Sequence, residues 1–398
     1  MTQSNIDFQD FKDQKRVLEN NINMKVDNNL FKNIYLNAKY NPQINSISKN
    51  YLQLKPLYLK TKGKLPKAIS KLYSNFTTNN PPKLKSLNKI KEKLDKDGFY
   101  VQENFLSNEE IEKIKLEIES EVFIGSGNGY KTSYKELENY ERLKDSDKYF
   151  DSIFSSQVNS NLIKKKSSLY RLLKNPFFEN VANSYLGSKS FINFLRILVS
   201  KSKNQKYFND NQIHLSANQF HFDYSHLRSV RFFIYLSDVI DETGPHTFIK
   251  SSHEDNFKYP RDQNDFFKIG YRNYYNGTSE GLIKDDWINK NFSSKDQIKF
   301  NGKKGTLIIE DTTGFHKGSN CLQGTREVLL LNYAISNIGN TELKLLPTIE
   351  DTKNVSNSDT IYSFSEKNKN FSKNFSIESS LFRKIKKKIF GKLNNYLI

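Results

Sequence analysis

Residues 219–253 read QFHFDYSHLRSVRFFIYLSDVIDETGPHTFIKSSH, and the segment in the middle of this stretch predicts a buried strand. SVRFFIYLSDVI (229–240) is almost continuously apolar and rich in β-branched and aromatic residues. DETGP (241–245) is a turn sequence that ends it. Two more strands are predicted downstream, in GTLIIEDTT (305–313) and REVLLLNYAIS (326–336). Antiparallel strands joined by such turns pack as two facing sheets.

Helices are expected before these strands. GFYVQENF (98–105) predicts a strand, and Ser107 with Glu110 three residues later forms a capping-box sequence. Ile111, Ile114 and Ile118 then recur at helical spacing. The predicted fold class is therefore α+β, a jelly-roll-like core of two sheets with helices to one side.

The chain divides into three parts. Residues 1–88 are Lys- and Asn-rich, are expected to form a helical N-terminal extension of unknown role, and end near the turn sequence TTNNPPK. Residues 89–340 have the densest hydrophobic patterning and contain all six histidines. Residues 341–398 run through a Ser/Asn/Lys-rich linker into a basic amphipathic helix.

Composition narrows the classes of protein that fit. At 398 residues the chain can bury a large core, and its single cysteine, Cys321, excludes an internal disulfide framework and suits a reducing compartment. We expect neither a signal peptide nor a membrane span, and we predict a cytoplasmic protein. The net charge of +18 arises from 62 basic and 44 acidic residues. No nucleic-acid-binding signature accompanies this charge, so nucleic acid is not predicted as a partner.

His221-Phe222-Asp223 is a candidate for part of a metal site. In an extended strand His221 and Asp223 share one face, and a non-heme Fe(II) site needs a second histidine beside them. His316, which follows a predicted strand and a short turn, is the best candidate. The others are close in sequence or lie in turns: His214, His226, His246 and His253. From these residues alone, an H-x-D pattern arises often by chance, and a polar strand with a surface histidine is the favoured interpretation.

Four segments, taken in their order along the chain, are more specific for one protein family than the three candidate ligands alone. DGFYVQENFLSNEEI (97–111), the stretch 219–253, KGTLIIEDTTGFHKGSN (304–320) and TREVLLLNYAI (325–335) together resemble the phytanoyl-CoA dioxygenase family. This family consists of Fe(II)- and 2-oxoglutarate-dependent oxygenases. The resemblance extends from about Leu94 to Ser336, and it implies a double-stranded β-helix (jelly-roll, cupin-like) core.

The resemblance also implies roles for individual residues. His221, Asp223 and His316 match the family's iron ligands, and Arg326 matches its basic residue for the distal carboxylate of 2-oxoglutarate. Fe(II), 2-oxoglutarate and O2 are the implied cofactor and co-substrates, and the implied activity is that of a dioxygenase acting as a hydroxylase. Halogenating relatives lack the carboxylate at the position of Asp223, so that a halide can bind the iron. Because Asp223 is present here, hydroxylation is expected and halogenation is not.

Strand alternation supports the role of Arg326 independently. Val328 and Leu330 share its face, so its guanidinium is expected to point inward, where it needs an anionic partner. A salt bridge to Glu310 or Asp311 is the alternative to 2-oxoglutarate.

Other residues near these segments have weaker predictions. Tyr235, with Arg231 on the same strand face, is a candidate for lining the 2-oxoglutarate pocket, and Ser319 is a candidate for a hydrogen bond near the iron; packing is the alternative for Tyr235. His253 is expected to be a structural turn residue, and Cys321 a buried thiol. His246 and Thr247 are expected near the pocket mouth, as substrate contacts or as satisfied turn residues.

The sequence leaves substrate and partners open. Residues 259–297, rich in Tyr, Asn and charge, are expected to form a lid or specificity loop. A small molecule or an acyl or sugar conjugate is the expected substrate class, and the oligomeric state is unknown. A catalytically silent jelly-roll binding protein is the rival function. A third possibility is a role at the membrane surface, carried by the basic helix in 379–398. Packing of the apolar stripe of this helix on the catalytic domain or on a second subunit is the alternative, and it is slightly favoured.

Overall fold

The computed structural model describes most of the middle of the chain and parts of its N-terminal region. The described residues are 8–28, 30–32, 34–35, 64–76, 85–125, 131–138, 153–157, 167–203, 218–223, 228–253, 283 and 285–335. Several predictions lie outside them: the linker and basic helix of 341–398, most of the expected lid, and His214 and His226.

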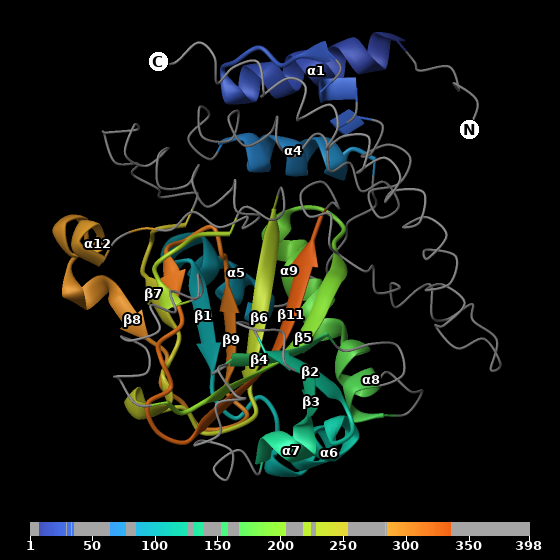
Figure 1. Cartoon of the computed structure of the whole chain (residues 1–398). Helices are drawn as coiled ribbons and strands as arrows, with labels where there is room; N and C mark the ends of the chain where they lie inside the picture. Colours follow the sequence, from blue (N-terminus) through green and yellow to red (C-terminus); the bar gives the residue numbers. More distant parts are fainter. Residues whose placement is uncertain are drawn as a thin grey trace, which may run out of the picture.

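An eight-stranded antiparallel sheet forms the larger layer of the core (Figure 1). Its strand order is β1-β9-β6-β11-β5-β4-β2-β3. The strands are β1 (Phe99–Gln102), β2 (Val122–Gly125), β3 (Lys131–Ser133), β4 (Ile153–Gln157), β5 (Phe191–Lys201), β6 (Ser229–Tyr235), β9 (Leu307–Glu310) and β11 (Thr325–Ala334).

A smaller antiparallel sheet has the strand order β10-β7-β8. It contains β7 (Thr247–Ile249), β8 (Gln297–Lys299) and the two-residue β10 (His316–Lys317). Two isolated bridges extend it beyond β10, because His221 pairs with His316 and Phe220 pairs with Ile283. Residues 220–223 therefore act as a further short strand of this sheet.

The chain alternates between the two sheets. β5 lies in the large sheet, residues 220–223 in the small one, β6 in the large one, β7 and β8 in the small one, β9 in the large one, β10 in the small one and β11 in the large one. This alternation is the jelly-roll connection that defines a double-stranded β-helix. The predicted fold class is confirmed.

Helices cover the outer side of the large sheet, with α5 and α9 behind it in Figure 1. α6 begins as predicted, with the Ser107–Glu110 capping box formed and Ile111, Ile114 and Ile118 buried. The helices are α1 (Phe8–Ile22), α4 (Lys64–Ser74), α5 (Lys85–Asp97), α6 (Asn108–Ile118), α7 (Tyr134–Glu138), α8 (Ser168–Leu173), α9 (Pro176–Leu186) and α12 (Asp285–Asn291).

The two faces of β11 contribute to two different apolar clusters. Val328 and Leu330 belong to a small cluster between the sheets, whereas Leu329 and Leu331 belong to the large cluster that includes the outer helices. Since alternate residues of a strand face opposite sides, Arg326 shares the inner face with Val328 and Leu330. The inward direction predicted for Arg326 is thus consistent with the packing.

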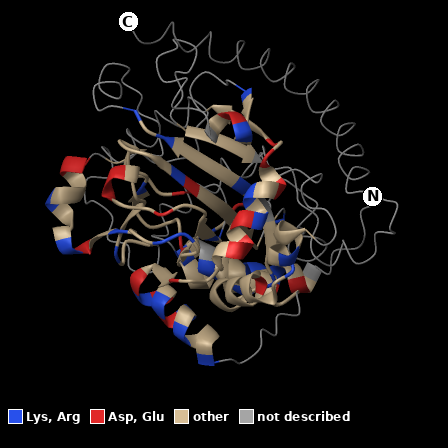
Figure 2. Cartoon of the chain, turned by 90° about the horizontal axis from the view of Figure 1, so that it is seen from below, with Lys and Arg blue, Asp and Glu red and all other residues tan. Residues whose placement is uncertain are grey.

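Some features were not predicted from the sequence. β2, β3 and β4 precede residue 190, where only helices were expected after the first strand. α5 begins at Lys85 and crosses the expected domain boundary at residues 88 and 89. In the described part of the chain no helix combines the length and apolarity needed to cross a bilayer. Lys and Arg are interspersed with Asp and Glu along the outer helices (Figure 2).

Gly305, just before β9, offers a test of how this strand is held. Its φ is +88°, and a Cβ there would lie 2.3 Å from the backbone oxygen of Leu106. Gly187, which caps α9 at φ +71°, has open space around the same position. We expect Gly305→Ala to lower the free energy of unfolding by about 2–6 kcal/mol, because left-handed strain and overpacking add.

Gly187→Ala is the matched control, with left-handed strain alone and a loss of about 1–2 kcal/mol. Urea denaturation of both variants measures the difference. Equal losses would contradict the predicted clash.

Candidate metal centre

His221 and His316 are direct partners across the small sheet. The N–H of each residue donates to the carbonyl oxygen of the other, both at 2.8 Å. Side chains of directly opposed antiparallel residues lie on the same side of a sheet. The two imidazole rings accordingly lie together, with centroids 4.2 Å apart.

Backbone hydrogen bonds orient both rings in the same way. Nδ1 of His221 lies 2.7 Å from the carbonyl oxygen of Gln219, and Nδ1 of His316 lies 2.9 Å from that of Gly314. A carbonyl oxygen only accepts, so each Nδ1 carries the proton. The Nε2 lone pair of each ring is left to bind a metal ion, which is the usual arrangement of histidine ligands.

Asp223 completes a group of three. Its backbone N–H donates to the carbonyl oxygen of Thr312 at 2.7 Å, and its Oδ2 lies 4.0 Å from Nε2 of His316. One candidate ligand atom from each of His221, Asp223 and His316 lies within 4.8 Å of the others. Within the described residues, this is the only such group of three His, Cys, Asp or Glu side chains.

The ionisation of the group suits metal binding. Burial lowers the pKa of His316 to about 3, so its ring is neutral at physiological pH. Burial alone would raise the pKa of Asp223, but the neighbouring Arg231 and then the two histidines outweigh it and hold that pKa well below its usual range. Neutral imidazoles and an ionised carboxylate are the forms that bind a metal ion.

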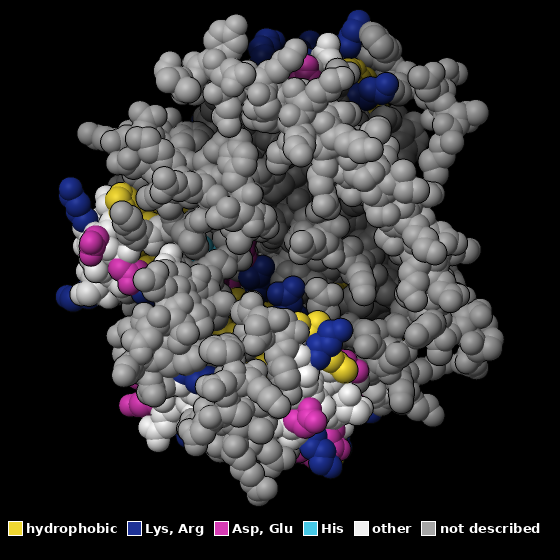
Figure 3. All heavy atoms as spheres, in the orientation of Figure 1, with side chains coloured by type: hydrophobic (Ala, Val, Ile, Leu, Met, Phe, Trp, Pro, Cys, Tyr) yellow, Lys and Arg dark blue, Asp and Glu magenta, His cyan; other side chains and the backbone are white. Residues whose placement is uncertain are grey.

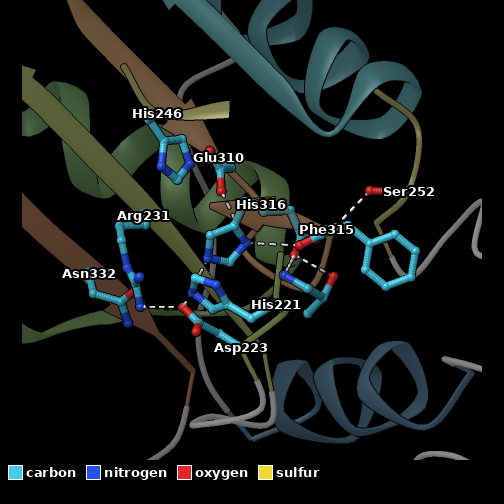
Figure 4. Close-up of polar contacts among 12 residues, drawn as sticks. His221, Asp223, Arg231, His246, Ser252, Glu310, Phe315, His316 and Asn332 are labelled. Carbon is cyan, nitrogen blue, oxygen red and sulfur yellow. Dashed lines mark hydrogen bonds and ion pairs between the residues drawn. The ribbon is translucent and has the colours of Figure 1, made fainter. Parts of the chain in front are cut away.

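A row of polar side chains from the large sheet faces the three residues (Figure 4). Arg231 of β6 pairs in register with Glu310 of β9 and with Asn332 of β11. Nη2 of Arg231 lies 2.7 Å from Oδ2 of Asp223, and its Nε donates to Oδ1 of Asn332 at 3.4 Å. Arg231, considered above for the 2-oxoglutarate pocket, therefore contacts a candidate metal ligand.

Glu310 was missed as a neighbour of the site. A 2.8 Å hydrogen bond joins its Oε2 to Nε2 of His246, and its Oε1 lies 3.6 Å from Nδ1 of His316. Burial raises the pKa of Glu310 to about 7, and it lowers the pKa of His246 well below the usual value. Phe233 and Phe300 flank the His246 ring. His246 is thus a partly buried, hydrogen-bonded residue whose ring lies 5.4 Å from that of His316, centroid to centroid.

Arg326 lies on the inner face without a protein carboxylate. Its Nη2 donates to Oγ of Ser200 at 3.1 Å, whereas Nη1 is buried and has no hydrogen-bond partner. No ion pair joins it to any acidic residue in the described part of the chain. The alternative partners are engaged elsewhere, since Glu310 bonds His246 and Asp311 accepts from Tyr185. A salt bridge to either is therefore not formed.

Tyr235 is buried near Arg326, and its hydroxyl donates to the carbonyl oxygen of Phe300 at 2.7 Å. Burial raises its pKa, so the phenol stays protonated. In the view of Figure 3, Lys and Arg side chains lie beside apolar ones in a hollow over the region of β6 and β11.

The remaining predicted residues have mixed outcomes. The Ser319 side chain makes no hydrogen bond to the three candidate ligands within the described structure, so its role stays a prediction. Cys321 is buried with a raised pKa, and Nε2 of His253 bonds the carbonyl oxygen of Asp95, so the buried-thiol and structural interpretations are confirmed. Thr247 is buried in β7, where it pairs in register with Lys317 of β10, next to His316, and its place near the pocket mouth stays a prediction.

Two histidines and one carboxylate with open positions opposite them form the donor set typical of non-heme Fe(II). The two Nε2 atoms that backbone bonding leaves available and the ionised carboxylate of Asp223 fit a bound ion.

Comparison with known proteins gives a family match. The model of the phytanoyl-CoA dioxygenase (PhyH) family matches residues 94–322. No curated protein sequence matches the chain.

Several solved structures are similar. The epimerase SnoN, in complex with Fe3+, alpha ketoglutarate and nogalamycin RO, is 13% identical, with a TM-score of 0.40 over 69% of this chain and 91% of its own. HygX from Streptomyces hygroscopicus, with nickel and 2-oxoglutarate bound, is 15% identical, with a TM-score of 0.37 over 66% and 88%. EctD from S. alaskensis, with 2-oxoglutarate and 5-hydroxyectoine, is 15% identical, with a TM-score of 0.37 over 69% and 81%.

The three-residue group predicts a metal stoichiometry. Purified protein is expected to bind one Fe(II) per chain, and His316→Ala should lose most of that iron because a two-ligand site remains. Metal analysis after anaerobic loading and desalting measures it. His253→Ala, which also removes a buried histidine, is the matched control and should keep the iron. Wild-type iron content in His316→Ala would show that the ligand assignment is wrong.

Proposed function

The chain belongs to the phytanoyl-CoA dioxygenase family of Fe(II)- and 2-oxoglutarate-dependent oxygenases, and from this we propose that it hydroxylates an aliphatic C–H group of its substrate. Succinate and CO2 are the accompanying products. The observation that supports the proposal most is the group of His221, Asp223 and His316, whose candidate ligand atoms lie within 4.8 Å of one another. Both Nδ1 atoms are bonded to backbone carbonyl oxygens, which leaves both Nε2 atoms for the ion.

The residues of the chain have separable roles in this proposal. His221, Asp223 and His316 hold the ion from one side, and bound Fe(II) would supply the activation of O2 that is coupled to oxidation of 2-oxoglutarate. The strand pairing fixes the ligands without help from a flexible loop. Phe233, Phe248 and Phe300 make the space between the sheets apolar beside the site, which limits water there.

Arg326 is proposed to bind the distal carboxylate of 2-oxoglutarate. Burial lowers the pKa of its guanidinium, so an anionic partner is needed to stabilise the charge. Its buried Nη1 can donate a hydrogen bond and has no acceptor, whereas its Nη2 donates to Oγ of Ser200. A carboxylate held by two guanidinium nitrogens is the arrangement that best satisfies such a residue. Tyr235 and Ser319 are assigned to the wall of the same pocket.

Asp223 favours hydroxylation as the outcome. Its carboxylate is in place beside both imidazoles, so the coordination position that a halide would need is taken. The substrate is proposed to be a small molecule or an acyl or sugar conjugate. A catalytically silent binding protein fits less well, because an inward arginine without a protein carboxylate and three convergent ligands serve no purpose in a pure binder.

The segments on either side of the oxygenase domain are assigned roles that add to this proposal and do not replace it. Residues 1–88 are assigned to an extension of the oxygenase domain, with residues 89–340 as that domain. Residues 341–398 are assigned to a linker and basic helix that could hold a cytoplasmic protein at an anionic membrane. Sedimentation with anionic vesicles, before and after removal of residues 379–398, tests that last assignment.

Substrate-dependent succinate formation tests the proposed reaction. A panel of small molecules and of acyl and sugar conjugates, incubated with full-length protein, Fe(II) and 2-oxoglutarate, should contain at least one compound that raises succinate above the uncoupled background. The product should gain one oxygen atom. A product of unchanged composition, such as an epimer, would retain the oxygenase family and overturn hydroxylation.

Arg326→Leu should weaken 2-oxoglutarate binding selectively. Truncating one member of a buried charge pair costs about 2–5 kcal/mol, which is roughly 30-fold or more in affinity. Titration of 2-oxoglutarate into metal-loaded protein measures the change. Arg228→Leu, which removes a buried arginine that stacks on Tyr185, is the matched control and should leave this affinity unchanged. Normal saturation by 2-oxoglutarate in a folded Arg326→Leu protein would rule the role out.

A further inference from the structure

Arg231 is a partly buried cation placed against a candidate metal ligand. Its side chain is only 15% exposed, and its Nη2 lies 2.7 Å from Oδ2 of Asp223. The residue is central in the large sheet, between Glu310 on β9 and Asn332 on β11. Its position is therefore set by two neighbouring strands.

Asn332 supports the other end of the guanidinium. It is fully buried, and its Oδ1 accepts from Nε of Arg231 at 3.4 Å. Figure 4 shows the order of these groups, with Asn332, Arg231 and Asp223 in a line that ends beside the two imidazoles. A planar guanidinium held at both ends has little freedom to turn.

The carboxylate of Asp223 needs such a constraint. A carboxylate turns readily about its last bond, because that torsion is broad. If both of its oxygens bound the ion, they would fill one of the positions that a two-histidine, one-carboxylate site keeps open. A cation paired with the carboxylate restricts that rotation, which favours binding of the ion through a single oxygen of Asp223.

We propose that Arg231, supported by Asn332, is a positioning residue that holds Asp223 in the orientation for binding the metal through one oxygen. The inference rests on the proposed function, because it takes the three ligands as given. Arg231 acts through Asp223, and it contacts neither 2-oxoglutarate nor substrate in this role.

The two inner arginines are thereby assigned different tasks. Asn332, the neighbour of Arg231, follows Arg326 by six residues on β11, which is about 20 Å along a strand. Arg231 has a carboxylate partner at the metal centre, whereas Arg326 has none in the described structure. The large sheet thus presents one guanidinium to a protein ligand and the other to a bound anion.

The test is a titration of metal-free, full-length protein with Co(II), read by calorimetry and by the visible absorption of the bound ion. Arg231→Gln should weaken Co(II) binding by about 10–100-fold, the usual effect of removing a residue that supports a ligand. The absorption spectrum should change, because the coordination number of Co(II) changes when Asp223 is free to turn. Arg231→Lys should restore part of the affinity, since it keeps the charge but not the planar fork.

Arg326→Leu is the matched control, as a buried arginine lost from the same face of the same sheet. It should keep Co(II) affinity within about twofold and weaken only 2-oxoglutarate binding. Arg231→Gln should weaken Co(II) binding and keep 2-oxoglutarate binding. Wild-type Co(II) affinity and spectrum in a folded Arg231→Gln protein, or tighter binding, would overturn the inference.

Asn332→Leu supplies a second test that leaves the arginine in place. A loss of Co(II) affinity smaller than that expected for Arg231→Gln supports the inference, and wild-type affinity overturns it. This test decides the matter even if Arg231→Gln does not fold. Failure of the proposed function looks different. In that case the wild-type protein itself would bind no Co(II), or His316→Ala would bind it normally.

Discussion

The pair of backbone hydrogen bonds between His221 and His316 is the constraint on which the site depends. It joins two short segments that are 95 residues apart in the chain and places their imidazoles on one side of the small sheet. Asp223 follows two residues later on the same segment, so the same pairing delivers the third ligand. The jelly-roll connections hold these segments in register, because each is bounded by strands of the large sheet.

The two sheets contribute different chemistry to one space. The small sheet supplies the candidate ligands, and the large sheet supplies the charges that decide their ionisation, chiefly Arg231 beside Asp223. Glu310 is buried next to His316, and burial brings its pKa to about 7, so it adds less negative charge than an ordinary carboxylate. The site can therefore keep one fixed anion, Asp223, beside the neutral imidazole of His316.

Long apolar runs made much of the fold predictable. β6, β9, β11 and the capped helix α6 all lie where sequence patterns placed them, because burial on one or both faces leaves a clear signature. β7 and β10 contain three and two residues, which is too short for any periodicity to show. β2, β3 and β4 contain only four, three and five residues, which is too short for a clear alternation to show.

The site was predictable to a similar extent. Strand alternation joined His221 to Asp223 and turned Arg326 inward, while His316 also required the resemblance to a family. Glu310 and His246 could not be paired from the sequence, because 64 residues separate them and neither belongs to a motif. The alternation of β6 did place Arg231 on the inner face, but only the three-dimensional register shows that it meets Asp223.

Buried polar atoms without hydrogen-bond partners link the stability of this fold to its proposed function. Oε1 of Glu310 and Nη1 of Arg326 are two such atoms, and both lie at the space between the sheets. Each costs about 1–3 kcal/mol when it is left without a partner. An anion bound at Arg326 would remove one of these costs, and a metal ion would add a further partner for Asp223, both only in the folded state. Ligands that bind only the folded chain stabilise it, so polar groups that cost stability when they lack partners are among those that make the binding sites of this fold.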